Sequence, residues 1–213
     1  MKLSFVFGAT LASAICFAQG VGPTPYLGAG DSPWNPSQFS FFYLENMEDG
    51  ALNTPGVSAS IGSVVGPGGL TDSVDEDDGS IDGSGSFGRS FFAGSGAVGI
   101  SFIFNASVLG ALPTHAGIVW TDGAATITFE AFDANNVSLG TLTGNHANGS
   151  FSGETAEDRF YGWEHGAGIS RIHIRNLSGG IEVDHLQYGV VPEPATMTVL
   201  GAGLFAALRR RRK

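Results

Sequence analysis

The chain has 213 residues, a length that favours one domain, and its 33 glycines and 9 prolines exclude a long helical bundle. Hydrophobic residues make up 42% of the chain, which excludes a fully disordered protein. The formal net charge is −10, yet five of the ten cations are the last five residues. From residue 3 to residue 190 the chain carries four arginines against nineteen acids, a charge of −15 that would repel nucleic acid.

Residues 1–18 predict a secretory signal peptide, with a buried N-terminal strand or helix as the alternative. A lone lysine precedes a long apolar stretch, and the compact residues Cys16 and Ala18 occupy the positions that signal peptidase reads. Cleavage after Ala18 would remove the only cysteine of the chain. The mature chain would then have no disulfide, no thiolate metal site and no cysteine nucleophile.

Residues 19–36 predict a flexible lead-in, and residues 37–190 predict an all-β ectodomain. Runs typical of strands recur every 8–15 residues between clusters of Gly, Asn, Asp and Ser. They cover Gln38–Leu44, Val98–Asn105, Ala116–Thr121, Ala125–Phe132, Ser138–Thr143, Arg159–Trp163, Ile169–Asn176 and Ile181–Tyr188. About eight strands in this length indicate an antiparallel β-sandwich of jelly-roll type.

Alternation of apolar and polar residues predicts which side chains face the core. Val98, Ile100, Phe102 and Phe104 share one face of their strand, and Ile127 lies on the inner face of another. We therefore expect Phe102 and Ile127 to be buried on central strands.

The end of the ectodomain predicts a turn and a bulge. The sequence of residues 176–180, Asn-Leu-Ser-Gly-Gly, is typical of a turn between the last two strands. In the final strand the alternation changes phase, because Ile181 and Val183 face one way and Leu186 the other. A bulge near residues 184–185 would explain this change.

An acidic loop is the sharpest chemical feature of the body. Six carboxylates occur within residues 72–82, and Ca²⁺ relieves such repulsion by binding six to eight oxygens. We expect a calcium site formed by Asp75, Asp77, Asp78 and Asp82, with a solvated, mobile loop as the alternative. The spacing does not follow the EF-hand pattern, because Ser80 stands where that loop requires glycine. Asp184 would join only if the loop folded back over the last strand.

Two further patterns suggest carbohydrate chemistry. Trp120 and Trp163 are expected to form a platform on which a sugar stacks, with a role in the core as the alternative. Glu182 and Asp184 resemble the start of the Glu-x-Asp-x-x-Glu strand of laminarinase-like glycosidases. The third position is Gln187, which has no carboxylic proton to donate, so we predict no catalytic residues.

The C-terminus has three parts in a fixed order. Pro192, Glu193 and Pro194 come first, and an uncharged apolar segment follows at residues 195–208. As a helix this segment would span about 21 Å, less than the roughly 30 Å of a hydrocarbon core, so it suits a transient membrane stop. The chain then ends in Arg209, Arg210, Arg211, Arg212 and Lys213, which should stay cytoplasmic.

This three-part end closely resembles the PEP-CTERM sorting signal of bacterial surface proteins. The resemblance rests on Val191–Ala195, the short apolar helix and the terminal basic residues, and covers residues 191–213. It implies recognition of Pro-Glu-Pro by an exosortase, a membrane transpeptidase, followed by loss of the tail and transfer to the cell surface. Proteins of this kind are typical of bacteria that make exopolysaccharide.

The body is also similar to a recurrent type of PEP-CTERM ectodomain, through residues 73–85, 114–123, 127–136 and 168–189. Its last strand resembles that of jelly-roll carbohydrate-binding modules. We therefore expect an exported, non-catalytic protein of the cell envelope or exopolysaccharide matrix, whose partners are signal peptidase, exosortase, the membrane before processing and exopolysaccharide. A carbohydrate-binding module that uses Ca²⁺ is the first alternative, and a secreted glycoside hydrolase is the second.

Overall fold

The structure is a computed structural model and describes residues 18–85, 87–151 and 157–192. The predicted signal peptide falls outside these residues, apart from Ala18. So do Glu193 and Pro194 of the sorting motif and the basic residues 209–213. Pro192, the first residue of that motif, is described and exposed. None of the helices in the described residues has the length and apolar character that crossing a membrane requires.

The described chain is an all-β fold, as the sequence predicts. Its strands are β1 (Ala18–Pro25), β2 (Phe41–Glu45), β3 (Val57–Ala59), β4 (Ser63–Val65), β5 (Ser90–Ala93), β6 (Ile100–Phe104), β7 (His115–Phe132), β8 (Ser138–Gly144), β9 (Arg159–His165) and β10 (Arg171–Val190). The helical turns are η1 (Ala29–Asp31), η2 (Pro36–Gln38), η3 (Asp75–Asp77) and α1 (Ala106–Leu109). Every strand pairing is antiparallel.

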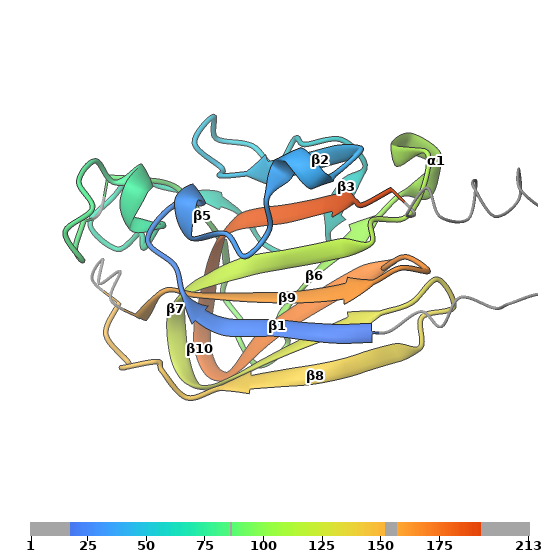
Figure 1. The fold of residues 1–213 in the computed structure, drawn as a ribbon. Coiled ribbons are helices and arrows are strands. Elements are labelled where there is room, and N and C mark those ends of the chain that lie inside the picture. The colour runs from blue at the N-terminus through green and yellow to red at the C-terminus, as the bar shows by residue number, and fades with distance from the viewer. Residues whose placement is uncertain (1–17, 86, 152–156, 193–213) are drawn as a thin grey trace, which may run out of the picture.

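Two long strands, β7 and β10, organise the sandwich. They pair with each other along most of their length, and both bend on the left of the view in Figure 1. The sequence predicts two strands in place of each, with a turn at residues 176–180, and this prediction was wrong. The glycines there bend β10 without reversing it, because both halves of β10 pair with β7.

The bend separates two sheets that share these strands. In the first sheet, the N-terminal half of β7 pairs with β9, which pairs with β1, and the C-terminal half of β10 pairs with β2 and β5. In the second sheet, the C-terminal half of β7 pairs with β8, and the N-terminal half of β10 pairs with β6. A β-sandwich results, with one face of each sheet turned inward.

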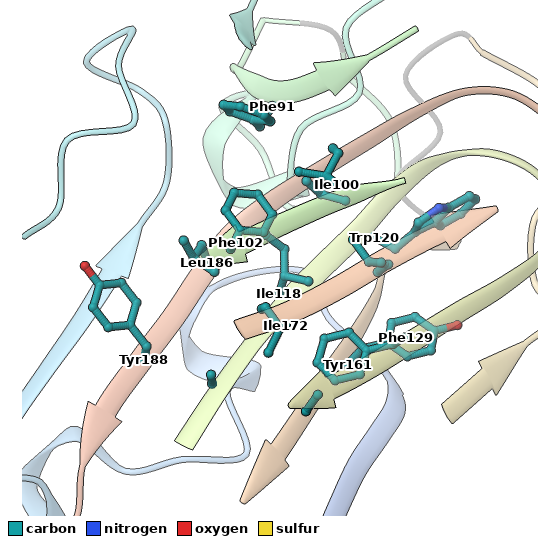
Figure 2. Packing of buried hydrophobic residues seen from close by; sticks show 14 of the residues in the cluster. Phe91, Ile100, Phe102, Ile118, Trp120, Phe129, Tyr161, Ile172, Leu186 and Tyr188 are labelled. Atoms are coloured by element: carbon teal, nitrogen blue, oxygen red, sulfur yellow. The ribbon is translucent and has the colours of Figure 1, made fainter. Parts of the chain in front are cut away.

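The main core fills the space between the sheets (Figure 2). Phe102 and Ile127 are fully buried, which confirms the inward faces predicted for their strands, and Ile172 of β10 is fully buried as well. Val98 is 61% exposed, so its assignment to the same face as Phe102 was wrong. It lies in a turn before β6 begins, where its amide N–H donates to the Ser95 carbonyl, and strand alternation does not apply there.

The outer face of the first sheet is covered as well. Tyr26, Trp34, Val74, Val119 and Phe160 form a second buried cluster there. The flexible lead-in predicted for residues 19–36 is instead ordered, because β1 pairs with β9 and the following segment buries two aromatic rings against the sheet. The segment lacks strand alternation, which is why the sequence did not reveal it.

Candidate functional site

The acidic loop folds back over the outer face of the first sheet. The amide N–H of Val74 donates to Asp184 Oδ2 at 3.0 Å, and the amide of Glu76 donates to the Leu27 carbonyl at 2.9 Å. This meets the condition under which Asp184 could join the loop. The predicted bulge is confirmed: the register against β7 shifts between Asp184 and Gln187, and His185 has a φ of 43°.

The loop covers an unusual number of buried acids. We call Asp72, Asp75, Asp158 and Asp184 the carboxylate cluster, and none of the four is more than 2% exposed. Burial in a medium that solvates ions poorly favours the neutral form of an acid. Accordingly, burial raises the pKa of Asp184 to about 7, although His185 and two backbone N–H groups oppose the shift.

His185 links this cluster to the segment that follows β1. Its Nδ1 lies 2.9 Å from the Tyr26 hydroxyl, and its Nε2 lies 2.8 Å from Asp77 Oδ2. The same hydroxyl accepts from Gln187 Nε2 at 2.9 Å. Burial disfavours the charged imidazole, but the hydrogen bond to Asp77 and the charge of Asp184 outweigh it and raise the pKa of His185. Both ring nitrogens therefore have partners.

The four predicted calcium ligands do not converge on one point. Asp75 points inward and accepts from the amide of Gly83, whereas Asp77 contacts His185. Asp78 is half-buried, and burial first, then the charge of Asp75, raises its pKa. Asp82 is exposed and accepts from the Ser84 amide within its own turn. In the described part of the chain, the one group of three potential ligands close enough for a metal is Asp77, Asp184 and His185, whose atoms lie within 4.8 Å of one another.

An open groove lies beside the loop, with a cavity volume of about 710 Å³. The glycine-rich residues 65–71 line it, together with Phe92 and residues 122–124, 149–151 and 179–182. Phe92 and Phe151 line it with exposed fractions of 38% and 66%. Glu182 also lines the groove; it accepts from Ser90 Oγ at 2.6 Å, and burial raises its pKa to about 7. The sequence does not indicate this groove, because its residues come from five separate segments.

The predicted tryptophan platform is corrected by the structure. Trp120 is fully buried and Trp163 is 6% exposed, and both belong to the core between the sheets (Figure 2 labels Trp120). Strand alternation places them on the inner face of β7 and β9, where no saccharide can stack on them. Both tryptophans are core residues, which was the alternative interpretation of the sequence.

The comparisons with known proteins concern the tail first. The family model described as the PEP-CTERM protein-sorting motif matches residues 190–213. The chain carries a PEP-CTERM protein-sorting motif. The motif implies export, processing by exosortase and delivery to the cell envelope or surface. This confirms the resemblance that the C-terminal residues carry.

The body of the chain has distant matches among solved structures. No curated protein matches the chain. Among solved structures, it is similar to the C-terminal family 22 carbohydrate-binding module of Clostridium thermocellum Xyn10B, at 13% identity and a TM-score of 0.40, over 74% of this chain and 97% of that one. It is also similar to the enzymatically active domain of tailspike protein 4 of bacteriophage CBA120, at 15% identity and a TM-score of 0.31, over 80% of this chain and 22% of that one.

Proposed function

We propose that this chain is a non-catalytic protein of the cell envelope or exopolysaccharide matrix, delivered there by its sorting motif and built on a sandwich of jelly-roll type. The match of residues 190–213 to the sorting motif carries the proposal, since it implies export and processing by exosortase. Removal of a signal peptide by signal peptidase, and transient anchoring of the tail in the membrane, belong to the same route.

The positions of the acids on β10 support a non-catalytic role. Asp184 is fully buried beneath the acidic loop, and both of its oxygens accept backbone N–H groups. Gln187 is also fully buried, with its side chain bonded to Tyr26 and Ser32. A glycosidase needs two carboxyls that flank the scissile bond of a bound sugar. The side chains of Asp184 and Gln187 are both buried and face away from solvent.

Catalysis is tested with the exopolysaccharide of the host strain. The purified protein should release no new reducing ends from this polymer during prolonged incubation, while a commercial glycanase serves as the positive control. Release that depends on Glu182 would overturn the non-catalytic proposal. Fractionation of cells should recover the protein from the envelope or matrix, and recovery from the cytoplasm alone would contradict the sorting route.

A carbohydrate-binding role is the second candidate, and the groove is the observation that favours it. Exposed Phe92 and Phe151 offer apolar faces beside the carboxylates of Glu182 and Asp122, a combination that suits sugar rings and their hydroxyls. On a glycan array, Phe92→Ala and Phe151→Ala should each lose the signal of the unaltered protein. Phe87→Ala is the matched control, because Phe87 is 76% exposed and lies outside the groove lining.

A further inference from the structure

Two acids lie side by side in the lining of the groove. Glu182 of β10 is the direct partner of Asp122 of β7 in the antiparallel register, and both residues line the groove. Residues directly opposite each other on antiparallel strands share a face of the sheet, with Cβ atoms about 5 Å apart. Two carboxylates in this position repel each other and destabilise the pairing. The groove is therefore a place where a positive charge would be stabilised.

The environment of Glu182 adds to this tension. The side chain is only 4% exposed, and its Oε1 accepts from Ser90 Oγ at 2.6 Å. Burial first, with a smaller contribution from the charge of Asp122, raises the pKa of Glu182 to about 7 against this hydrogen bond. In the empty groove a proton on Glu182 relieves the repulsion. A cation placed between the two acids would relieve it with both carboxylates charged.

The charged residues that line the groove are all of one sign. They are Asp122 and Glu182, and no described arginine, lysine or histidine belongs to the lining. Arg89 donates to the carbonyl of Gly66, which does line the groove, but Arg89 itself does not. The body as a whole carries a charge of −15. A polyanion is therefore disfavoured in the groove, and a ligand with positive charge is favoured.

A protonated amine fits the two acids better than a metal ion does. Ca²⁺ takes six to eight oxygen ligands. In the part of the chain that the structure describes, neither Asp122 nor Glu182 belongs to a group of three potential ligands close enough to share an ion. An ammonium group has three N–H donors and forms strong hydrogen bonds with carboxylates, so two acids already make a good site for it.

The aromatic residues of the groove favour a sugar over a simple amine. Phe92 of β5 is the direct partner of Glu182 on its other side, so Asp122, Glu182 and Phe92 form a row across three neighbouring strands. Strands lie about 4.8 Å apart, which makes this row about 10 Å long, longer than one sugar ring. Phe92 and Phe151 are 38% and 66% exposed, and such faces suit the apolar side of a pyranose.

We infer that the groove binds an amino sugar with a free, protonated amine, as in a polymer of glucosamine. The ammonium lies between Asp122 and Glu182, and a ring of the same polymer packs against Phe92. The inference rests on the carbohydrate-binding role proposed above and specifies the class of sugar. An N-acetylated amine carries no charge and a uronic acid carries the wrong one, so the same two acids discriminate against both.

The test compares oligosaccharides that differ in charge. The exported protein is titrated calorimetrically, just below neutral pH, with glucosamine, N-acetylglucosamine and galacturonic acid oligomers of equal length. We expect the glucosamine oligomer to bind at least about tenfold more tightly than its acetylated form, and the uronic acid oligomer not to bind. Equal affinities, or tighter binding of the uronic acid, would overturn the inference.

These titrations also separate the inference from the role on which it rests. Binding of the acetylated oligomer that Phe92→Ala abolishes, without any preference for the free amine, would overturn the inference and leave the carbohydrate-binding role standing. If none of the oligomers binds, both fail. Spermidine, an amine without a ring, should bind at least about tenfold more weakly than the glucosamine oligomer. Equal affinity for spermidine would show that the groove recognises charge alone and would overturn the assignment to a sugar.

Substitutions locate the charge that recognises the amine. Asp122→Asn keeps the shape of the side chain and the Oδ1 that accepts the Gly123 amide, and should reduce the preference for the free amine to within about twofold. Asp82→Asn removes the same charge from an exposed residue outside the lining and should keep the preference. If circular dichroism shows that Asp122→Asn is poorly folded, Glu182→Gln takes its place. An unchanged preference in a folded variant of either acid, or its loss in Asp82→Asn, would overturn the inference.

Discussion

Substitutions of single residues test most directly how much the buried face of a strand contributes to the stability of the fold. Phe102 is fully buried on β6 and packs against Phe91, with ring centroids 5.6 Å apart. Phe102→Ala should lower the free energy of unfolding by about 3–5 kcal/mol, because it removes apolar contacts and leaves a cavity. Urea denaturation measures the change. Ile103→Ala, on the outer face of the same strand and 43% exposed, is the control and should cost far less. Equal losses in the two variants would contradict the assignment of faces.

His146 offers a second test at this scale. Its Nε2 lies 2.7 Å from the Tyr161 hydroxyl, and its ring meets the edge of Trp120. Burial and the charge of Arg159 lower the pKa of His146 to about 4, against a partly opposing hydrogen bond. A folded pKa below the unfolded value of about 6.5 means that the unfolded chain binds more protons between these values. The stability that neutral His146 contributes is thus complete above pH 6.5 and is lost as the pH falls towards 4.

Titration of the imidazole followed by NMR checks this expectation. The folded protein should show the His146 resonance moving near pH 4, and a midpoint near 6.5 would mean that water reaches the ring freely. In denaturation experiments, His146→Gln should lose less stability than the unaltered protein between pH 6.5 and pH 4. His165→Gln, which changes a histidine beyond this contact, should follow the unaltered protein.

At the scale of elements, the bend shared by β7 and β10 is what creates two sheets. Gly123 has a φ of 155°, and a Cβ there would lie 2.6 Å from Asn176 Oδ1. Asn176 has little room to move, because it is fully buried and its Nδ2 donates to the carbonyls of Ser178 and Gly180. Gly123→Ala should therefore destabilise the fold by at least about 1–3 kcal/mol.

Thermal denaturation measures the effect of this substitution, and Gly30→Ala provides the comparison. A Cβ at Gly30 would meet no atom within 4 Å, and its backbone is not in the left-handed region. If Gly123→Ala leaves the melting temperature unchanged, the bend tolerates a side chain at this position. The cause of the bend would then lie elsewhere in the two strands.

The same elements show how far the sequence predicts this fold. Strands with strict alternation, such as β6 and the C-terminal half of β7, were found with their faces, because one buried face imposes a period of two. The change of phase in β10 correctly indicated a bulge. The short strands β3, β4 and β5 and the strand β1 were not predicted, since three or four residues, or a run of Gly and Pro, show no clear period. Local turn signals at residues 176–180 predicted a reversal, but pairing with β7 on both sides turned them into a bend.

At the scale of the whole molecule, the candidate site could be predicted only in part, because segments that are distant in the sequence form it. The acidic loop is visible in the sequence, whereas Asp158 is an unremarkable residue there, separated from Asp72 by 86 positions. Only the packing of the loop over the first sheet makes Asp158 a buried acid whose oxygens have no hydrogen-bond partner among the described residues. The groove has the same origin, because glycines from several segments meet at the edge of the sandwich. Local chemistry was therefore predictable, and convergence of distant segments was not.

Export to the cell surface also depends on the whole chain, since the basic tail must be cleaved from the acidic body. The net charge of −10 combines a body of −15 with a terminal cluster of five cations. Within the matched motif at residues 190–213, Pro192, Glu193 and Pro194 separate this tail from a generic weak anchor. Glu193→Ala should leave export intact, because the predicted signal peptide is unchanged, but should block removal of the tail by exosortase.

Intact-mass analysis of material recovered from the cell envelope and surface measures this directly. The unaltered protein should end near residue 191 and lack the five basic residues, while Glu193→Ala should retain them and stay with the membrane fraction. Thr196→Ala changes a residue just beyond Pro-Glu-Pro and should be processed normally. An identical mature C-terminus in the unaltered protein and in Glu193→Ala would show that cleavage does not read this motif, and the charge separation would then require another protease.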